Sequence, residues 1–200
     1  MTGLAPLQIL AAWFSPGYPV GAYSYSHGLE WAVEAGDVAD PAGLAAWATM
    51  SVTHAMATDD PGPVAELAEA LAPSAERHLE TMAQGAAFAR TTAAAYGAPV
   101  QAAAYPVAVG QAARWFGLPS DLTVTLFLQA FAANLVSAGV RLVPIGQTDG
   151  QRLLADLRPL VASVAAAALT APLSAVGGLA QRGDLAAMRH ETQYSRLYRS

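Results

Sequence analysis

Histidine and carboxylate side chains are the first candidates for chemistry, because the chain has no cysteine to act as a nucleophile or thiolate ligand. Its four histidines, His27, His54, His78 and His190, fall on separate segments, whereas a structural zinc site needs clustered ligands. The nearest candidate pair is His27 with Glu30, which would share one helix face and could give two ligands to nickel or zinc. One pair does not close a site. A hydrogen-bonded structural histidine is therefore favoured, with a second copy across a dimer axis as the alternative.

The sequence also lacks the common motifs for nucleophilic catalysis and phosphate binding. The nucleophile elbow Gly-x-Ser-x-Gly does not occur. Ser24 and Ser26 lie near His27, but turn and capping hydrogen bonds explain serines that follow a loop rich in proline and glycine. A catalytic pair of His27 as base and Glu30 as its orienter is the remaining alternative, and it lacks a third group. We therefore predict that the chain is not an enzyme, with no catalytic residue, no metal site and no tightly bound cofactor.

The composition favours a protein that binds other proteins. Hydrophobic residues make up 54% of the 200 residues and charged residues 12%, about half the roughly 25% charged share of an ordinary domain. So few charges predict an apolar surface covered by a partner or a second copy. A net charge of −5 argues against nucleic acid as a partner. The charge is uneven, because residues 1–76 hold nine acids and no base, whereas residues 77–200 hold ten arginines and six acids.

The chain reads as cytoplasmic and without a membrane partner. Its beginning shows no signal or transit peptide pattern, and the lack of cysteine suits a reducing compartment. The longest uncharged run, Leu122–Val140, is long enough to suggest a membrane span. Five polar residues interrupt it, however, and a buried core helix is the favoured interpretation.

Apolar periodicity, with glycine and proline between the periodic stretches, predicts an all-α fold. We expect one domain over residues 1–200, a helical bundle of about seven to ten helices, with residues 173–200 as a flexible C-terminal tail. After a short N-terminal helix, the expected helices are 23–35, 40–57, a short one ending at Leu71, 74–96, 105–116, 120–142, and one that begins at Pro144 and ends before Pro172.

Four blocks of the sequence resemble the UreF family of urease accessory proteins. Each block is modest evidence alone, but all four occur in the family's order. The blocks are Ser15–Glu30, the segment from Pro73 to Gly85, Asn134–Gln151 and the ending His190–Ser200. The chain departs from the family by being shorter than many relatives between His54 and Pro73, and by carrying Tyr198 where phenylalanine is commoner.

The resemblance implies an all-α homodimer that bridges the accessory protein UreD/UreH and the GTPase UreG and delivers nickel to apo-urease without catalysis of its own. Regulation of GTP hydrolysis on UreG within the same complex is the alternative. Residues 173–200 resemble the family tail that orders when UreD/UreH binds. The anchors implied for that contact are Tyr194, Arg196, Leu197, Tyr198 and Arg199.

The remaining partner-binding candidates lie in the two most characteristic blocks, which the resemblance places near the dimer centre or the surface that faces the GTPase. From the first block come Tyr23, Ser24, His27 and Glu30. From the turn after the apolar helix come Arg141, Gln147 and Gln151, which with Glu30 could line a polar passage for nickel or steady UreG.

Overall fold

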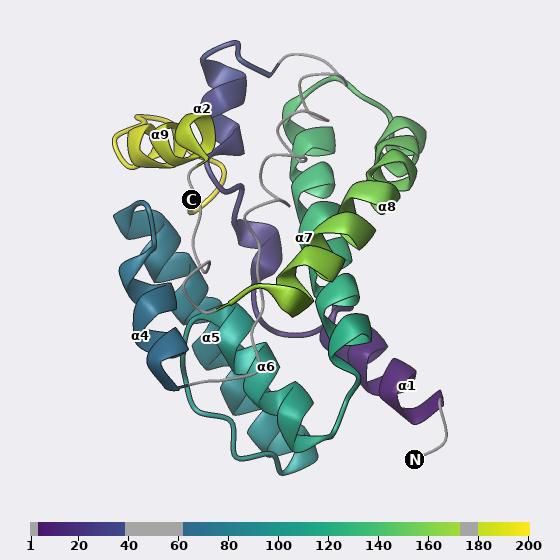
Figure 1. Ribbon diagram of the computed structural model, residues 1–200. Helices are drawn as coiled ribbons and strands as arrows, with labels where there is room; N and C mark the ends of the chain where they lie inside the picture. Colours follow the sequence, from purple (N-terminus) through teal and green to yellow (C-terminus); the bar gives the residue numbers. More distant parts are fainter. Residues whose placement is uncertain (1–3, 39–61, 173–179) are drawn as a thin grey trace.

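Eight α-helices and one 3-10 turn make up the described parts of the chain in the computed structural model, residues 4–38, 62–172 and 180–200 (Figure 1). No strand occurs in these ranges, so the all-α prediction is confirmed. The helix expected over 40–57 lies outside the described residues. The elements are α1 (Leu4–Trp13), η1 (Ala22–Ser24), α2 (Leu29–Glu34), α4 (Gly62–Ala70), α5 (Ala75–Tyr96), α6 (Tyr105–Trp115), α7 (Ser120–Leu142), α8 (Gln147–Thr170) and α9 (Gln181–His190).

The predicted boundaries of α5, α6 and α7 are confirmed to within one residue, whereas α8 begins at Gln147 and not at Pro144. In α5 the capping residues act as expected. The Ser74 hydroxyl accepts a hydrogen bond from the Arg77 amide (3.2 Å) and begins α5. Gly97 ends α5 in the left-handed conformation, with φ of 71°. The helix α9 was missed, because glycines punctuate the sequence around it.

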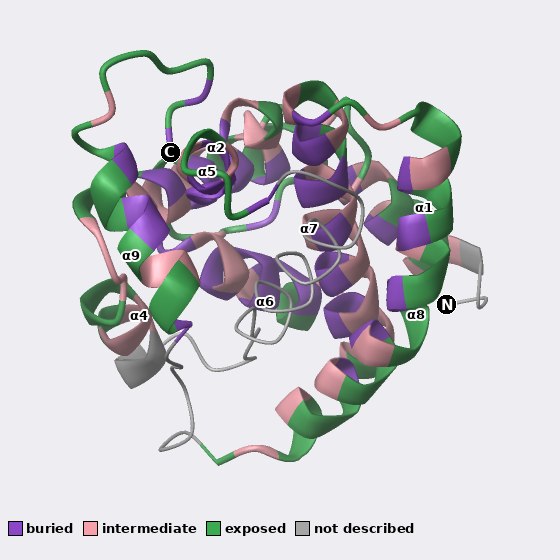
Figure 2. Cartoon of the chain, turned by 90° about the horizontal axis from the view of Figure 1, so that it is seen from above, coloured by how far each residue is buried: buried purple, intermediate pink, exposed green. Residues whose placement is uncertain are grey.

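Two helix pairs, α5 with α6 and α7 with α8, form the body, and α2 packs against α9 at one end of it (Figure 1). The core lies between the pairs, where Trp13, Phe88 and Leu128 are almost fully buried. Trp13 meets the Phe88 ring edge-on, with the ring centroids 5.2 Å apart. Figure 2 shows the buried residues on the inward faces of the helices. This packing places α2, α5 and α9 around one end of the chain's fold.

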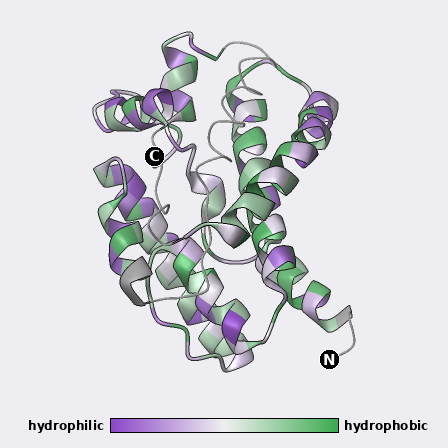
Figure 3. Ribbon diagram, viewed as in Figure 1, coloured by the Kyte–Doolittle hydropathy of each residue, from purple (hydrophilic) through white to green (hydrophobic). Residues whose placement is uncertain are grey.

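The helices α7 and α8 are long and apolar enough to cross a membrane by length and composition alone. Figure 3 shows hydrophobic residues gathered along α7. Half of its most apolar stretch is buried inside the protein, as in a core helix. In α8, Pro159 has no amide proton for the carbonyl of Ala155, and the Arg158 side chain donates to that carbonyl instead (3.0 Å).

Gly85 sets the spacing between α5 and the segment before α6. A Cβ atom at this position would lie 1.8 Å from the Ala103 carbonyl oxygen. We expect Gly85→Ala to lower the free energy of unfolding by about 3 kcal/mol, because backbone must move to admit the methyl group. Urea denaturation followed by circular dichroism measures the change. Gly17→Ala is the control, because the nearest atom to its added Cβ is 3.8 Å away; equal stability losses in both variants would contradict the packing argument.

Candidate functional site

The turn before α2 separates two residues that the sequence placed on one helix. Instead of a continuous helix over 23–35, the chain forms η1, then an irregular turn, then α2 from Leu29. His27 and Gly28 both adopt positive φ, 57° and 80°, which a helix cannot accommodate. Gly28 also lets α9 approach, since a Cβ there would lie 2.6 Å from the Ala187 amide nitrogen. The prediction of one helix through this block was therefore wrong.

As a result, His27 and Glu30 face different partners. The Nδ1 atom of His27 lies 3.1 Å from a carboxylate oxygen of Glu80 and is also in contact with the Arg77 guanidinium. Its ring packs edge-on against Phe131. The His27 ring is hydrogen-bonded, as the structural interpretation expects, and it faces other groups than Glu30 does. Among the residues that the structure describes, no group of three or more His, Asp or Glu side chains could hold a metal ion.

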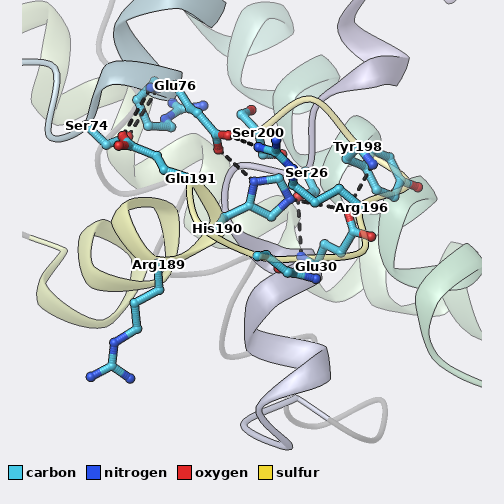
Figure 4. Close-up of polar contacts among 12 residues, drawn as sticks. Ser26, Glu30, Ser74, Glu76, Arg189, His190, Glu191, Arg196, Tyr198 and Ser200 are labelled. Atoms are coloured by element: carbon cyan, nitrogen blue, oxygen red, sulfur yellow. Dashed lines mark hydrogen bonds and ion pairs between the residues drawn. The ribbon is translucent and has the colours of Figure 1, made fainter.

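Glu30 instead receives the end of the chain (Figure 4). Its carboxylate is buried, with 6% of the residue exposed. One oxygen accepts the Leu197 amide at 2.6 Å, and the other accepts the Tyr198 amide at 2.9 Å. The second oxygen also lies 3.2 Å from Nε2 of His190. A buried carboxylate is costly unless donors satisfy it, and here two backbone amides and an imidazole do so.

Glu76, in the first turn of α5, receives two further groups from the same part of the chain. One of its oxygens lies 2.6 Å from Nδ1 of His190, and the other accepts from the Arg196 guanidinium at 2.6 Å. His190, the last residue of α9, is completely buried. Its imidazole therefore joins α9 to α2 through Glu30 and to α5 through Glu76 (Figure 4).

Ser200 completes the contact. The amide and hydroxyl of Ser26 both donate to its carbonyl oxygen at 2.6 Å. Its own hydroxyl donates to Glu80 at 2.8 Å, and only 1% of the residue is exposed. Glu80 lies one turn after Glu76 on α5, and it also accepts from Gln84 at 3.0 Å. We call Glu30, Glu76 and Glu80 the receiving carboxylates and residues 190–200 the docked segment.

The structure gives residues 180–200 of the expected C-terminal tail one defined conformation, and the flexibility of residues 173–200 stays a prediction. Residues 181–190 form α9, and the docked segment is bonded to the chain's own receiving carboxylates. The buried carboxylates Glu30 on α2 and Glu80 on α5 need donors, which the segment supplies. Further ordering of residues 173–200 on partner binding stays a prediction, and residues 173–179 lie outside the described residues.

Docking divides the predicted partner-binding residues of the segment into two groups. Tyr198 is buried, with its ring beneath the Arg141 guanidinium (5.1 Å to the centroid), and Arg196 is paired with Glu76. Tyr194 and Leu197 project into solvent, with relative exposures of 105% and 82%. The docked segment thus has an inner side that holds it in place and an outer side free to contact another protein.

The other predicted residues lie partly at this contact. The Ser24 carbonyl accepts the Arg199 amide at 2.8 Å, and the Tyr23 side chain beside it is 69% exposed. Gln147 and Gln151 lie exposed in the first turns of α8, outside the contact between the docked segment and the receiving carboxylates.

Sequence reasoning missed Glu76, Glu80, His190 and Ser200 as members of the site. A signal was present in the charge pattern. Two of the three receiving carboxylates belong to the acidic first 76 residues, and the groups that bind them come from the arginine-rich remainder. Glu76 and Glu80 are also four residues apart on one helix, so their side chains share a face.

Comparison with known proteins identifies the family. The family model UreF matches residues 35–158. The chain is 50% identical to the urease accessory protein UreF of Cereibacter sphaeroides strain KD131, over 98% of this chain and 99% of that one. The chain belongs to the UreF family. It is also 49% identical to the UreF of Rhodopseudomonas palustris strain HaA2, covering 98% and 94% of the two chains, and 48% identical to that of Ruegeria pomeroyi, covering 96% and 95%. The predicted family is therefore confirmed, and its named relatives are urease accessory proteins.

The phenol of Tyr198 gives a direct test of the docked geometry. Its hydroxyl is buried without a hydrogen-bond partner. Burial raises the pKa of this phenol, an effect that the Arg141 guanidinium partly opposes. We expect Tyr198→Phe to raise the free energy of unfolding by about 1 kcal/mol, because an unsatisfied buried hydroxyl is removed.

Tyr18→Phe is the matched control for this substitution. The Tyr18 hydroxyl is bonded to that of Thr92 at 2.8 Å, so its loss should lower the free energy of unfolding by about 1 kcal/mol. Denaturant titrations of both variants measure the two values. A clear destabilisation by Tyr198→Phe would show that its hydroxyl has a partner in solution.

Proposed function

We propose that this UreF-family chain bridges the accessory protein UreD/UreH and the GTPase UreG, so that the assembled complex delivers nickel to apo-urease, and that the chain catalyses no reaction itself. The observation that carries the proposal is the outer side of the docked segment. Tyr194 and Leu197 are held outward by anchored neighbours, and exposed large hydrophobic side chains on a fixed backbone are typical of binding surfaces. Family membership supplies the identity of the partners.

UreD/UreH is the partner that we assign to this outer side. Arg196 and Arg199 are exposed residues near Leu197 in the sequence, so the segment combines aromatic, aliphatic and guanidinium groups. Tyrosine and arginine are enriched among the residues that dominate binding energy. The acids nearest in the fold, Glu30 and Glu76, are turned inward and already bonded. The outer side offered to UreD/UreH is therefore mainly apolar, with Tyr194 and Leu197 as its large side chains.

The test is binding of purified UreD/UreH to a Tyr194→Ala, Leu197→Ala double variant. Hot-spot residues contribute about 2 kcal/mol or more each, so we expect the dissociation constant to rise at least about thirtyfold. The stability of the chain should change little, because both side chains are exposed. Leu185→Ala, at a 53% exposed leucine on α9, is the control. Unchanged binding by the double variant would refute this assignment.

Point variants are preferable to deleting residues 194–200. Deletion would also remove Tyr198 and Ser200, whose contacts lie inside the protein. Loss of binding after deletion could then come from undocking of the remaining segment. The two exposed side chains separate the binding surface from the contacts that hold it.

The homodimer and the contact with UreG are further parts of the proposal. The low content of charged residues, 12%, supports an extensive covered surface. Tyr23, Arg141, Gln147 and Gln151 are all exposed and belong to the two most characteristic blocks of the resemblance. We assign these residues to the dimer interface or to the surface that contacts UreG. The complex would assemble in the cytoplasm.

Nickel is cargo of the complex in this proposal, and the chain alone holds no tight nickel site or other cofactor. Clustered cysteine and histidine ligands are the usual basis of tight nickel binding. The imidazole of His27 is already bonded to Glu80 and Arg77. Equilibrium dialysis of the isolated chain should show no saturable site at micromolar nickel. A stoichiometric site retained at that concentration would contradict this part of the proposal.

A further inference from the structure

The imidazole of His190 is enclosed by carboxylates at both of its nitrogens. Nδ1 lies 2.6 Å from a Glu76 oxygen and Nε2 lies 3.2 Å from a Glu30 oxygen. An ionised carboxylate only accepts hydrogen bonds, whereas a neutral imidazole has one nitrogen that donates and one that only accepts. A neutral ring would direct a lone pair at one of the two carboxylates. A ring protonated at both nitrogens donates to both.

The charges around the ring lead to the same conclusion. From α2 the ring faces Glu30, and from α5 it faces Glu76, whose second oxygen is bonded to Arg196. With a protonated His190, two carboxylates are balanced by one guanidinium and one imidazolium. With a neutral ring, one negative charge remains without compensation beside a side chain that is fully buried.

Other charged groups of the same region are engaged elsewhere. On α5, Glu80 is paired with Arg77 and His27. Glu191, the next residue of the docked segment, accepts the Ala75 amide at 2.8 Å. Of the other arginines nearby, Arg189 lies over the Trp31 ring, Arg141 lies over the Tyr198 ring, and Arg199 is hydrogen-bonded to Tyr25. None of these contacts replaces a second proton on His190.

We propose that docking of residues 190–200 is linked to protonation of His190, so that the segment is held when the ring carries both protons and is released as the pH rises. The same Glu30 oxygen that faces Nε2 accepts the Tyr198 amide at 2.9 Å. Loss of the ring proton therefore acts directly on the backbone that presents Leu197 and Tyr194. This inference rests on the proposed function only in naming that outer side as the partner surface, whose presentation the proton controls.

The direction of the pH effect follows from linkage. The docked state binds a proton that a histidine in water loses near about pH 6.5. Because each ring nitrogen faces a carboxylate in the docked state, docking is favoured at low pH and weakens as the pH rises. For one linked proton the docking equilibrium changes by up to about tenfold per pH unit.

The experiment is NMR on the full chain labelled with ¹⁵N, without UreD/UreH. At about pH 6, both ring nitrogens of His190 should give the signals of an imidazolium. Hydrogen exchange of the Leu197 and Tyr198 amides, corrected for the intrinsic effect of pH, should lose at least about tenfold protection between about pH 6 and about pH 8.5. Amides of α7 should keep their protection across this range.

Variants separate the linked proton from general stability. In His190→Gln, protection of the two amides should be lower at about pH 6 and should no longer vary with pH. In Glu76→Gln, where the ring still faces Glu30, the variation with pH should be weaker than in the wild type. His78→Gln is the matched control, because His78 pairs with Glu69 at the surface, away from the docked segment, and it should keep the wild-type profile. If His190→Gln does not fold, the wild-type profile and the Glu76→Gln profile still decide.

Protection that is independent of pH in the wild type, or the ring signals of a neutral tautomer at about pH 6, would overturn the proposal. Because this measurement contains no partner, such a result leaves the binding of UreD/UreH untouched. Conversely, unchanged binding by the Tyr194→Ala, Leu197→Ala variant would refute the proposed partner surface and leave the proton linkage standing.

Discussion

The satisfaction of three carboxylates, two of them buried and the third largely covered, is the constraint on which the C-terminal part of this structure depends. Glu30, Glu76 and Glu80 lie on α2 and α5 with little access to water. Each would be strongly destabilising if left without donors, so the chain has to bring donors to them. The donors are backbone amides such as that of Leu197, the Ser200 hydroxyl, the Arg196 guanidinium and the His190 imidazole. The position of every exposed group on that segment follows from these internal bonds.

The turn before α2 shows how the body is shaped to receive the segment. Positive φ at His27 and Gly28 interrupts the helix that the sequence suggested. As a result, the side chains of His27 and Glu30 point to different partners. Asn134 of α7 then holds the irregular backbone through the carbonyl of Ala22 at 2.9 Å. This arrangement lets Ser26 and Glu30 face the docked segment while His27 faces α5. Residues 22–30 therefore form an internal receptor for the docked segment.

Much of the fold could be predicted from the sequence, because local signals decide the ends of the long helices. Ser74 and Gly97 bound α5 as expected, and the apolar run of α7 is a helix packed in the core. The split helix at residues 23–35 could not be predicted, because positive φ at a histidine is imposed by tertiary contacts. The helix α9 was missed for a similar reason: its buried face is defined by α2 and α5, which are distant in the sequence. The candidate site was likewise predictable only in its local features. Glu30 and the ending were found as residues of interest, but their mutual contact depends on the fold as a whole.

The bonds between Ser26 or Glu30 and residues 197–200 join positions 167 to 174 apart in the sequence. Contacts of such separation form late in folding, because a long loop must close before they stabilise anything. Residues 190–200 also leave the ribosome after the helices that receive them, so a nascent chain can assemble its body before it can assemble this contact. The outward placement of Tyr194 and Leu197 is consequently among the last features to appear. A partner that recognises it would select chains whose folding is already finished.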